Sequence, residues 1–166
     1  MNINGFTCLS TALQRNLNGE VIGMEKEKVR KKVERIFETP KVGIMSTAYG
    51  NKPYSRYVTF YNDGWNLYTE VTAESVDSDE IKDNNLSYII LGYDEEADSS
   101  YVEMLARTEV VMDQPTVDWL WDQQDDHDIE ALENQVMVVL KFIPKEIKLM
   151  NANDEIDVPE VLDFAG

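Results

Sequence analysis

The sequence predicts a mainly β fold in which antiparallel strands form a barrel and a few helices flank it. The clearest strand runs from Tyr54 to Tyr61, where alternate residues suit opposite faces of a sheet. A turn is expected at Asn62-Asp63-Gly64, because glycine tolerates a positive φ and aspartate can bond its own backbone. Further short strand-like runs follow with little helix between them, and this order of elements indicates a closed β fold.

The remaining elements follow from local patterns. A helix over Met24 to Glu38 carries one apolar stripe, and it ends at Thr39-Pro40 because proline disfavours a helical residue before it. Shorter helices are expected over Asp77 to Asn84 and from Pro115 onward. Strands are expected at Val42–Thr47, Tyr54–Tyr61, Trp65–Glu70, Ser87–Tyr93, Tyr101–Met112, Gln135–Ile143 and Ile147–Met150.

The charge of the chain is strongly negative and unevenly distributed. The 166 residues carry a net charge of −17, and from Tyr57 to Leu140 there are 21 acidic residues against two cations, Lys82 and Arg107. Such a surface repels nucleic acid and anionic membranes, which both need lysine or arginine to neutralise phosphates. No apolar run approaches the roughly 18–20 residues of a membrane span. We therefore expect no nucleic acid and no membrane among its partners.

The N-terminal segment and the single cysteine bear on location. Residues 1–23 contain one cation, Arg15, and no continuous apolar block, so they do not resemble a secretory signal. Cys8 cannot form an internal disulfide, which suits a reducing compartment. The sequence thus favours a cytoplasmic protein. Residues 1–23 themselves fit either a short amphipathic arm or a disordered extension.

Two polar features are candidates for a binding site. Arg56 lies on a strand face otherwise lined by aromatic and β-branched residues, which hints at an anion-binding site; the alternative is an arginine in a surface salt bridge. His127 lies among aspartates, but consecutive residues rarely converge on one ion, so a solvated acidic loop is favoured over a metal site. No metal site is predicted, and the sequence identifies no catalytic residue.

Three segments resemble one known family. KPYSRYVTF at Lys52 to Phe60, ILGY at Ile90 to Tyr93 and, more weakly, IKLMN at Ile147 to Asn151 are similar to the FMN-binding split barrels related to pyridoxamine 5′-phosphate oxidase, in their general stress protein branch. The resemblance implies a six-stranded antiparallel split β-barrel over residues 24–151. It leaves residues 1–23 as an extension and residues 152–166 as a C-terminal tail, expected to be loosely held.

The resemblance also implies a cofactor site at a homodimer interface. Arg56 matches the arginine that holds the FMN phosphate, and Tyr57, Val58 and Thr59 match the residues beneath the flavin ring. The neighbouring strand end is matched by Tyr68 and Thr69, while Thr72 and Ser75 are the hydroxyl residues near the phosphate. Arginine suits this task because its planar fork can bind two phosphate oxygens.

The sequence departs from the family pattern in two places. Relatives place a phosphate-binding lysine three residues before the Glu-Ile of the short helix, and here that position is Asp77. A carboxylate beside a phosphate removes an attraction and adds a repulsion, each up to about 4 kcal/mol before screening. The loop after the Trp119–Trp121 helix also differs, because it is acidic in place of an aromatic-rich, glycine-containing loop.

These features leave two functional hypotheses. The first is a homodimeric FMN-binding protein acting as a flavin-dependent oxidoreductase of unknown substrate. The second is a split-barrel homodimer without flavin that acts as a binding or structural protein, because the phosphate-binding lysine position is Asp77. The intact stretch around Arg56 favours the first hypothesis, and Asp77 favours the second.

Overall fold

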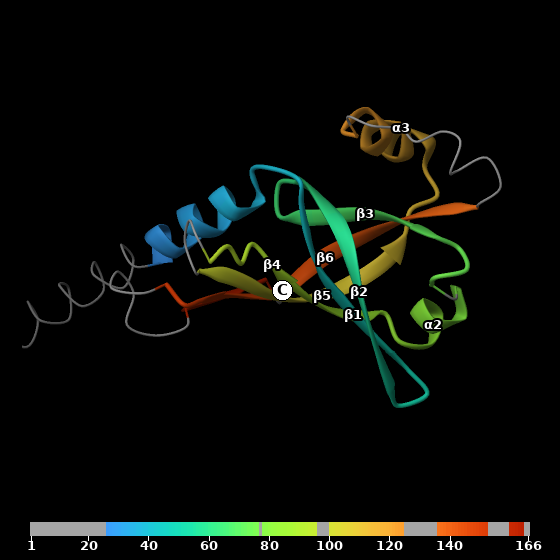
Figure 1. Ribbon diagram of the computed structural model, residues 1–166, viewed down its shortest axis with the longest axis horizontal. Coiled ribbons are helices and arrows are strands. Elements are labelled where there is room, and N and C mark those ends of the chain that lie inside the picture. Colours follow the sequence, from blue (N-terminus) through green and yellow to red (C-terminus); the bar gives the residue numbers. More distant parts are fainter. Residues whose placement is uncertain (1–25, 77, 96–99, 125–135, 153–159, 165–166) are drawn as a thin grey trace, which may run out of the picture.

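A computed structural model describes residues 26–76, 78–95, 100–124, 136–152 and 160–164 of the chain. The expected N-terminal arm, Asp77 and the acidic loop containing His127 lie outside these described residues. The side chains of Ser78, Asp79 and Glu160 are likewise not described. Within the described part, strands dominate and helices flank them, as the sequence predicts (Figure 1).

The described elements follow the predicted order. A helix over residues 26–37 precedes β1 (Lys41–Tyr49), β2 (Lys52–Asp63), β3 (Asn66–Thr72), α2 (Ser78–Asp83), β4 (Leu86–Leu91), β5 (Tyr101–Val110), α3 (Gln114–Asp122), β6 (Met137–Met150) and β7 (Glu160–Asp163). Asp113 caps α3 by accepting a hydrogen bond from the Thr116 N–H, and Pro115 lies in the first turn. Proline is harmless there, since helix starts have unpaired N–H groups.

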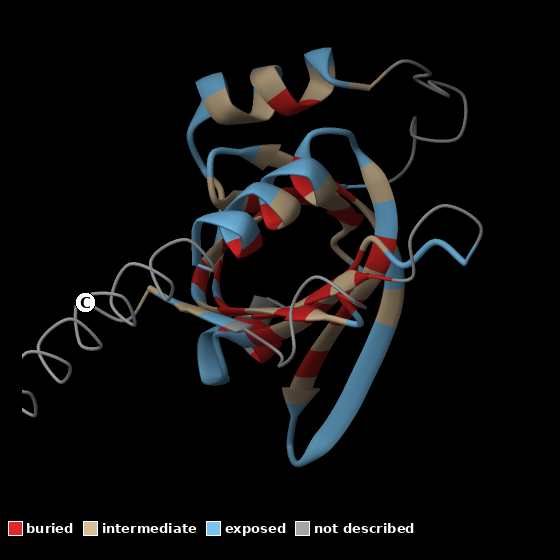
Figure 2. Cartoon of the chain, turned by 90° about the vertical axis from the view of Figure 1, so that its left-hand side faces the viewer, coloured by how far each residue is buried: buried red, intermediate tan, exposed pale blue. Residues whose placement is uncertain are grey.

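The strands form one closed antiparallel sheet. Their order is β3-β2-β1-β4-β5-β6, and β3 pairs in turn with β6, so six strands of the described chain close into a barrel. Buried residues alternate with more exposed ones along β1 and β5, which is the pattern expected of barrel strands (Figure 2). The predicted six-stranded antiparallel split barrel is confirmed.

Apolar side chains of the N-terminal helix fill one end of the barrel. Val29, Val33 and Phe37 are buried in the main core, and Figure 2 shows this helix lying across the barrel opening with its buried residues turned inward. Ile81 of α2 joins the same core, and α2 lies at the other end of the molecule in Figure 1. The two helices therefore flank opposite ends of the barrel.

The C-terminal part differs from the expectation in two ways. The two strands expected over Gln135–Ile143 and Ile147–Met150 are one continuous strand, β6, because a bulge accommodates the chain after Pro144. Leu105 pairs with Glu146 and the next residue pairs with Pro144, so Lys145 has no opposite residue on β5. Part of the expected tail is also ordered, since β7 pairs with the second half of β6.

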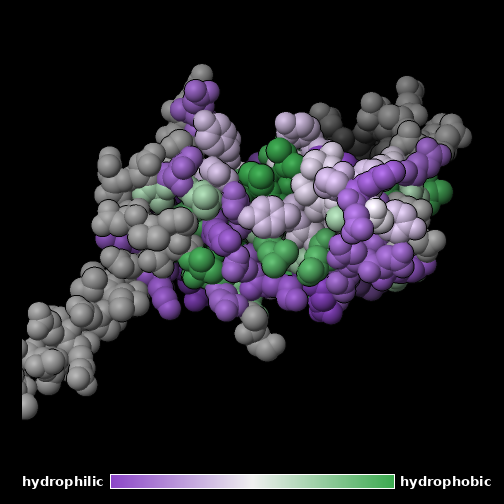
Figure 3. All heavy atoms as spheres, turned by 90° about the horizontal axis from the view of Figure 1, so that it is seen from below, coloured by the Kyte–Doolittle hydropathy of each residue, from purple (hydrophilic) through white to green (hydrophobic). Residues whose placement is uncertain are grey.

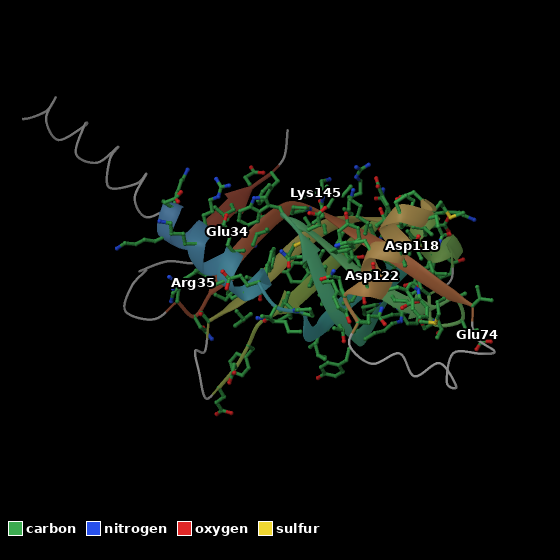
Figure 4. All side chains as sticks on the ribbon, turned by 90° about the horizontal axis from the view of Figure 1, so that it is seen from above. Glu34, Arg35, Glu74, Asp118, Asp122 and Lys145 are labelled. Atoms are coloured by element: carbon green, nitrogen blue, oxygen red, sulfur yellow. The ribbon has the colours of Figure 1, made fainter. Side chains whose placement is uncertain are left out.

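Charged side chains lie at the periphery on separate elements. Asp118 and Asp122 of α3 lie in one half of the molecule, with Glu74 near its end, whereas Glu34 and Arg35 lie on the N-terminal helix in the other half (Figure 4). Within the described ranges, no helix has the length and apolarity needed to cross a membrane.

We expect the tight packing of β1 to make Gly43 intolerant of a side chain. A Cβ at this position would lie 2.7 Å from the carbonyl oxygen of Ile90 and 2.7 Å from Cδ1 of Leu91. Gly43→Ala should therefore lower the free energy of unfolding by about 1–3 kcal/mol, measured by urea denaturation. The control is Gly50→Asn, where a Cβ meets nothing within 4 Å and asparagine tolerates the φ of +54°. Equal losses for both variants would contradict this packing argument.

Candidate functional site

The edge of β2 that faces away from β1 carries the features of a ligand-binding edge. A two-residue turn joins β1 to β2, with positive φ at both Gly50 and Asn51, and Tyr49 pairs with Lys52 across it. In such a hairpin the residues flanking the turn exchange both hydrogen bonds, and bonded pairs recur at every second residue. The backbone groups of Arg56 and Val58 consequently point to β1. Those of Tyr57 and Thr59 point to the opposite edge.

That opposite edge of β2 is only partly covered by β3. The two strands pair at Tyr61–Tyr68, Asn62–Leu67 and Asp63–Asn66, and β3 then runs along β6 instead. Beyond the paired residues, the Thr69 hydroxyl donates a hydrogen bond of 2.7 Å to the Thr59 carbonyl. Within the described part of the chain, no strand pairs with the β2 edge at Ser55 and Tyr57. Their N–H and C=O groups are available to a planar polar ligand.

Arg56 lies close to this edge in a network that links three elements. Its Nη1 donates a hydrogen bond of 3.2 Å to Oγ1 of Thr47 on β1, and its Nη2 lies 3.5 Å from Oε2 of Glu80 on α2. The Thr47 hydroxyl in turn donates to Oε1 of Glu80. The structure shows the ion-pair alternative for Arg56. The side chain forms a salt bridge, yet it stays 21% exposed and keeps N–H donors for an anion.

Local contacts hold the network in place. The Tyr54 ring lies beside Arg56, with the guanidinium carbon 5.9 Å from the ring centroid, a cation–π distance. On the other side, Asn84 at the end of α2 donates a hydrogen bond of 3.3 Å to the Ala48 carbonyl of β1. The helix that carries Glu80 is therefore attached to the strand that carries Thr47.

The other predicted site residues fall into two groups. Thr72 and Ser75 lie together, because both the backbone N–H and the hydroxyl of Ser75 donate to the Thr72 carbonyl, at 2.9 Å and 2.8 Å. They precede α2, so this turn connects β3 to the helix that bears Glu80. Tyr68 instead turns its ring to the outside of the barrel, where it packs edge-on against Trp119 of α3 at 5.1 Å. Its backbone pairs with Tyr61 of β2, so the structure does not bring Tyr68 to the open part of the β2 edge.

The resolved pKa shifts lie away from this site. Burial, and next a hydrogen bond to Glu103, raise the pKa of Tyr88 on β4 to about 12. Burial lowers the pKa of Lys41 at the start of β1. The hydrogen bond from Thr116 lowers the pKa of Asp113, as the cap of α3 requires. These shifts follow from structural contacts of each group and do not mark a second site.

The sequence reasoning missed two members of the network, Thr47 and Glu80. Both residues are only 5% exposed, which is unusual for a glutamate and requires a partner. A signal was available for each. Glu80 precedes the buried Ile81 in a short helix, and Thr47 alternates with the buried Met45 on the inward face of β1. Within the described residues, no group of three or more histidine, cysteine or acidic side chains is placed to hold a metal ion.

Comparison with known proteins identifies relatives over most of the chain. No protein-family model matches it. General stress protein 26 of Bacillus subtilis (strain 168) is 31% identical over 136 residues, which cover 81% of this chain and 97% of that protein. Two crystal structures share the fold. A putative pyridoxamine 5′-phosphate oxidase from Listeria innocua has a TM-score of 0.61 and 25% sequence identity. The match covers 75% of this chain and 99% of the Listeria chain.

The second crystal structure is general stress protein 26 from Bacillus anthracis strain Sterne, with a TM-score of 0.63 and 22% identity, covering 81% of this chain and 98% of its own. At that identity the likeness speaks for the fold alone. The Bacillus subtilis relative matches nearly its whole length at higher identity, and the Listeria structure carries the oxidase family name. The chain therefore belongs to the general stress protein 26 branch of the split-barrel proteins related to pyridoxamine 5′-phosphate oxidase.

Proposed function

We propose that this protein binds FMN along the open edge of β2 and acts, as a cytoplasmic homodimer, as a flavin-dependent oxidoreductase of unknown substrate. The observation that carries the proposal is the position of a partly exposed arginine beside an unpaired strand edge. FMN presents a phosphate and a planar ring with N–H and C=O groups along one side. Arg56 suits the phosphate, and the unpaired backbone groups of Tyr57, next to Val58 and Thr59, suit the ring.

These contacts suggest separate roles for the cofactor and the protein. FMN, when bound, supplies the electron-transfer chemistry, and the protein supplies position and electrostatics. Arg56 would anchor the cofactor, and the turn at Thr72 and Ser75 adds hydroxyl groups beside α2. Val58 is partly buried and packs against the main core, so it would support the strand beneath the cofactor. Membership of the general stress protein 26 branch, whose solved relatives include a putative pyridoxamine 5′-phosphate oxidase, supports this assignment.

A second candidate function is that of a binding or structural protein without flavin. Two observations favour it. The chain has Asp77 where relatives carry a phosphate-binding lysine, and the charge of Arg56 is partly balanced by Glu80 at 3.5 Å. Both features reduce the positive potential that a phosphate would meet. A titration with FMN separates the two candidate functions, since they differ in whether FMN binds at all.

An absorbance spectrum of the purified protein, followed by an FMN titration monitored by flavin fluorescence, tests the proposal. We expect flavin absorbance or micromolar binding, and Arg56→Ala should weaken FMN binding by about a hundredfold, since it removes a charge-assisted contact of roughly 3 kcal/mol. The matched control is Arg107→Ala, which removes an arginine paired with Glu109 at 3.0 Å on β5. A colourless protein that ignores near-millimolar FMN would favour the flavin-free candidate.

The identity of residue 77 should set the strength of FMN binding. Asp77→Lys replaces a repulsion with an attraction beside the proposed phosphate position, and a net gain of about 3 kcal/mol corresponds to roughly a hundredfold lower Kd. The same fluorescence titration measures it, with Asp118→Lys on α3 as a control for the change in net charge. An unchanged Kd for Asp77→Lys would mean that residue 77 does not adjoin the phosphate.

Exposed apolar side chains support the homodimer. Val42 and Tyr57 project from the outer face of the β1–β2 hairpin and are 63% and 78% exposed. From below, hydrophobic residues lie in the middle of a largely hydrophilic face (Figure 3). Side chains of this kind favour an interface with a second copy, which would also cover the open edge of β2. A cytoplasmic location agrees with the single cysteine, Cys8.

A charge on the hairpin face should dissociate the proposed dimer. Val42→Asp places a carboxylate where the second copy would bury it, so we expect the molar mass measured by light scattering to fall from two chains to one. Val161→Asp on β7 is the matched control, because Val161 is another exposed strand valine, 39% exposed, outside that face. A wild-type protein that is already a monomer at micromolar concentration would contradict the dimer.

A further inference from the structure

We propose that Glu80 and Thr47 are positioning residues that hold the Arg56 guanidinium for a phosphate group, and that they thereby set the preference of the site for FMN over riboflavin. This inference rests on the proposed function, because it concerns the same site. It goes further by assigning a role to two buried residues that would not themselves touch the flavin. The argument has three steps: the geometry of the network, its burial and its effect on phosphate.

The geometry leaves the useful part of the guanidinium free. Arginine has five N–H donors in a rigid plane. One is donated to Thr47 at 3.2 Å and one faces Glu80 at 3.5 Å, so these two contacts do not use all five donors, and 21% of the side chain is exposed to a ligand. Because the Thr47 hydroxyl accepts from Arg56 and donates to Glu80, the three side chains form a closed ring of contacts. This ring fixes the plane of the fork as well as its position.

Burial makes the network rigid and directional. Thr47 and Glu80 are nearly inaccessible, whereas Arg56 reaches the surface, so the network is anchored inside and open outward. A buried carboxylate needs a charged partner, and Arg56 is the cation that the structure gives Glu80. The three residues come from β1, β2 and α2, so their positions are set by the barrel. An arginine held in this way loses less conformational entropy when it binds phosphate than a free one.

Glu80 affects phosphate binding in two opposite ways. It holds Arg56 in place, which strengthens the contact, and its negative charge offsets part of the arginine charge, which weakens it. Substitution by glutamine separates these effects, because it removes the charge and keeps the shape: the amide oxygen can face Arg56, and the NH2 group can donate to the Thr47 hydroxyl. Substitution by alanine removes both. The inference states that positioning is the larger effect.

The test compares the dissociation constants of FMN and riboflavin, whose only difference is the phosphate. Glu80→Ala should reduce the preference for FMN about tenfold and leave riboflavin binding unchanged, since one charge-assisted contact is misaligned. Glu80→Gln should keep the preference at or above that of the wild-type protein. Thr47→Val should lower the preference for FMN, whereas Thr47→Ser, which retains the hydroxyl group, should keep it. Glu109→Ala is the matched control, because it removes a glutamate paired with an arginine outside the site.

A second measurement reads the positioning without flavin. In protein labelled with ¹⁵N-arginine, the ¹⁵N relaxation of the Arg56 Nε–H group should indicate a rigid side chain in the wild type and in Glu80→Gln, and a mobile one in Glu80→Ala. Urea denaturation verifies that each variant is folded. A preference for FMN that Glu80→Ala leaves intact, or a mobile Arg56 in the wild type, overturns this inference alone. If Arg56 is rigid but the protein binds neither FMN nor riboflavin, the proposed function is overturned, and the role of the network in flavin preference falls with it.

Discussion

The pairing of β3 with the first half of β6 closes the barrel, and the rest of the molecule depends on it. β3 pairs with β2 at only three residues, whereas its pairing with β6 runs from Leu67 to Thr72. Closure removes the free edges of an open sheet, but it also separates β2 from its neighbour. The candidate site lies at that separation. The open edge of β2 is thus a consequence of how the barrel closes.

An open strand edge inside a folded protein needs a partner. Unpaired N–H and C=O groups invite association with another chain, so natural proteins cover such edges or use them. In this chain the edge is bordered by Arg56 on one side and by exposed apolar side chains, Val42 and Tyr57, on the outer face of the hairpin. A planar cofactor and a second copy of the chain would satisfy these two requirements together. Fold and proposed function are linked through this one feature.

The electrostatics of the site contrast with those of the chain as a whole. The net charge is −17, yet the proposed anion site relies on one arginine with a buried glutamate beside it. Burying Glu80 is unfavourable unless a cation and a hydroxyl compensate, and Arg56 and Thr47 supply both. The pair therefore serves the fold even without a ligand. This explains how the same residues are compatible with either candidate function.

Much of the architecture could be read from local patterns. The alternation around Arg56, the helix that ends before Pro40 and the proline near a helix start at Pro115 predicted elements that the structure contains. Pro144 misled the assignment of β6, because a proline suggests a break in a strand, whereas the bulge at Lys145 lets the strand continue. β7 was missed for a different reason. Its four residues pair with the second half of β6, and Leu162 packs against the main core, contacts that a local pattern does not reveal.

The sequence by itself determined the strands, their turns, the acidic character and the resemblance that singled out Arg56. These properties depend on residues close together in the chain, where periodicity and turn chemistry act directly. Only the tertiary structure decided that Glu80 and Thr47 meet Arg56, that Tyr68 turns outward beneath Trp119, and that β2 keeps an open edge. Those outcomes depend on strand register and barrel closure, which bring together residues far apart in the chain, such as Thr47 and Glu80, 33 positions apart, and Tyr68 and Trp119, which are farther apart still.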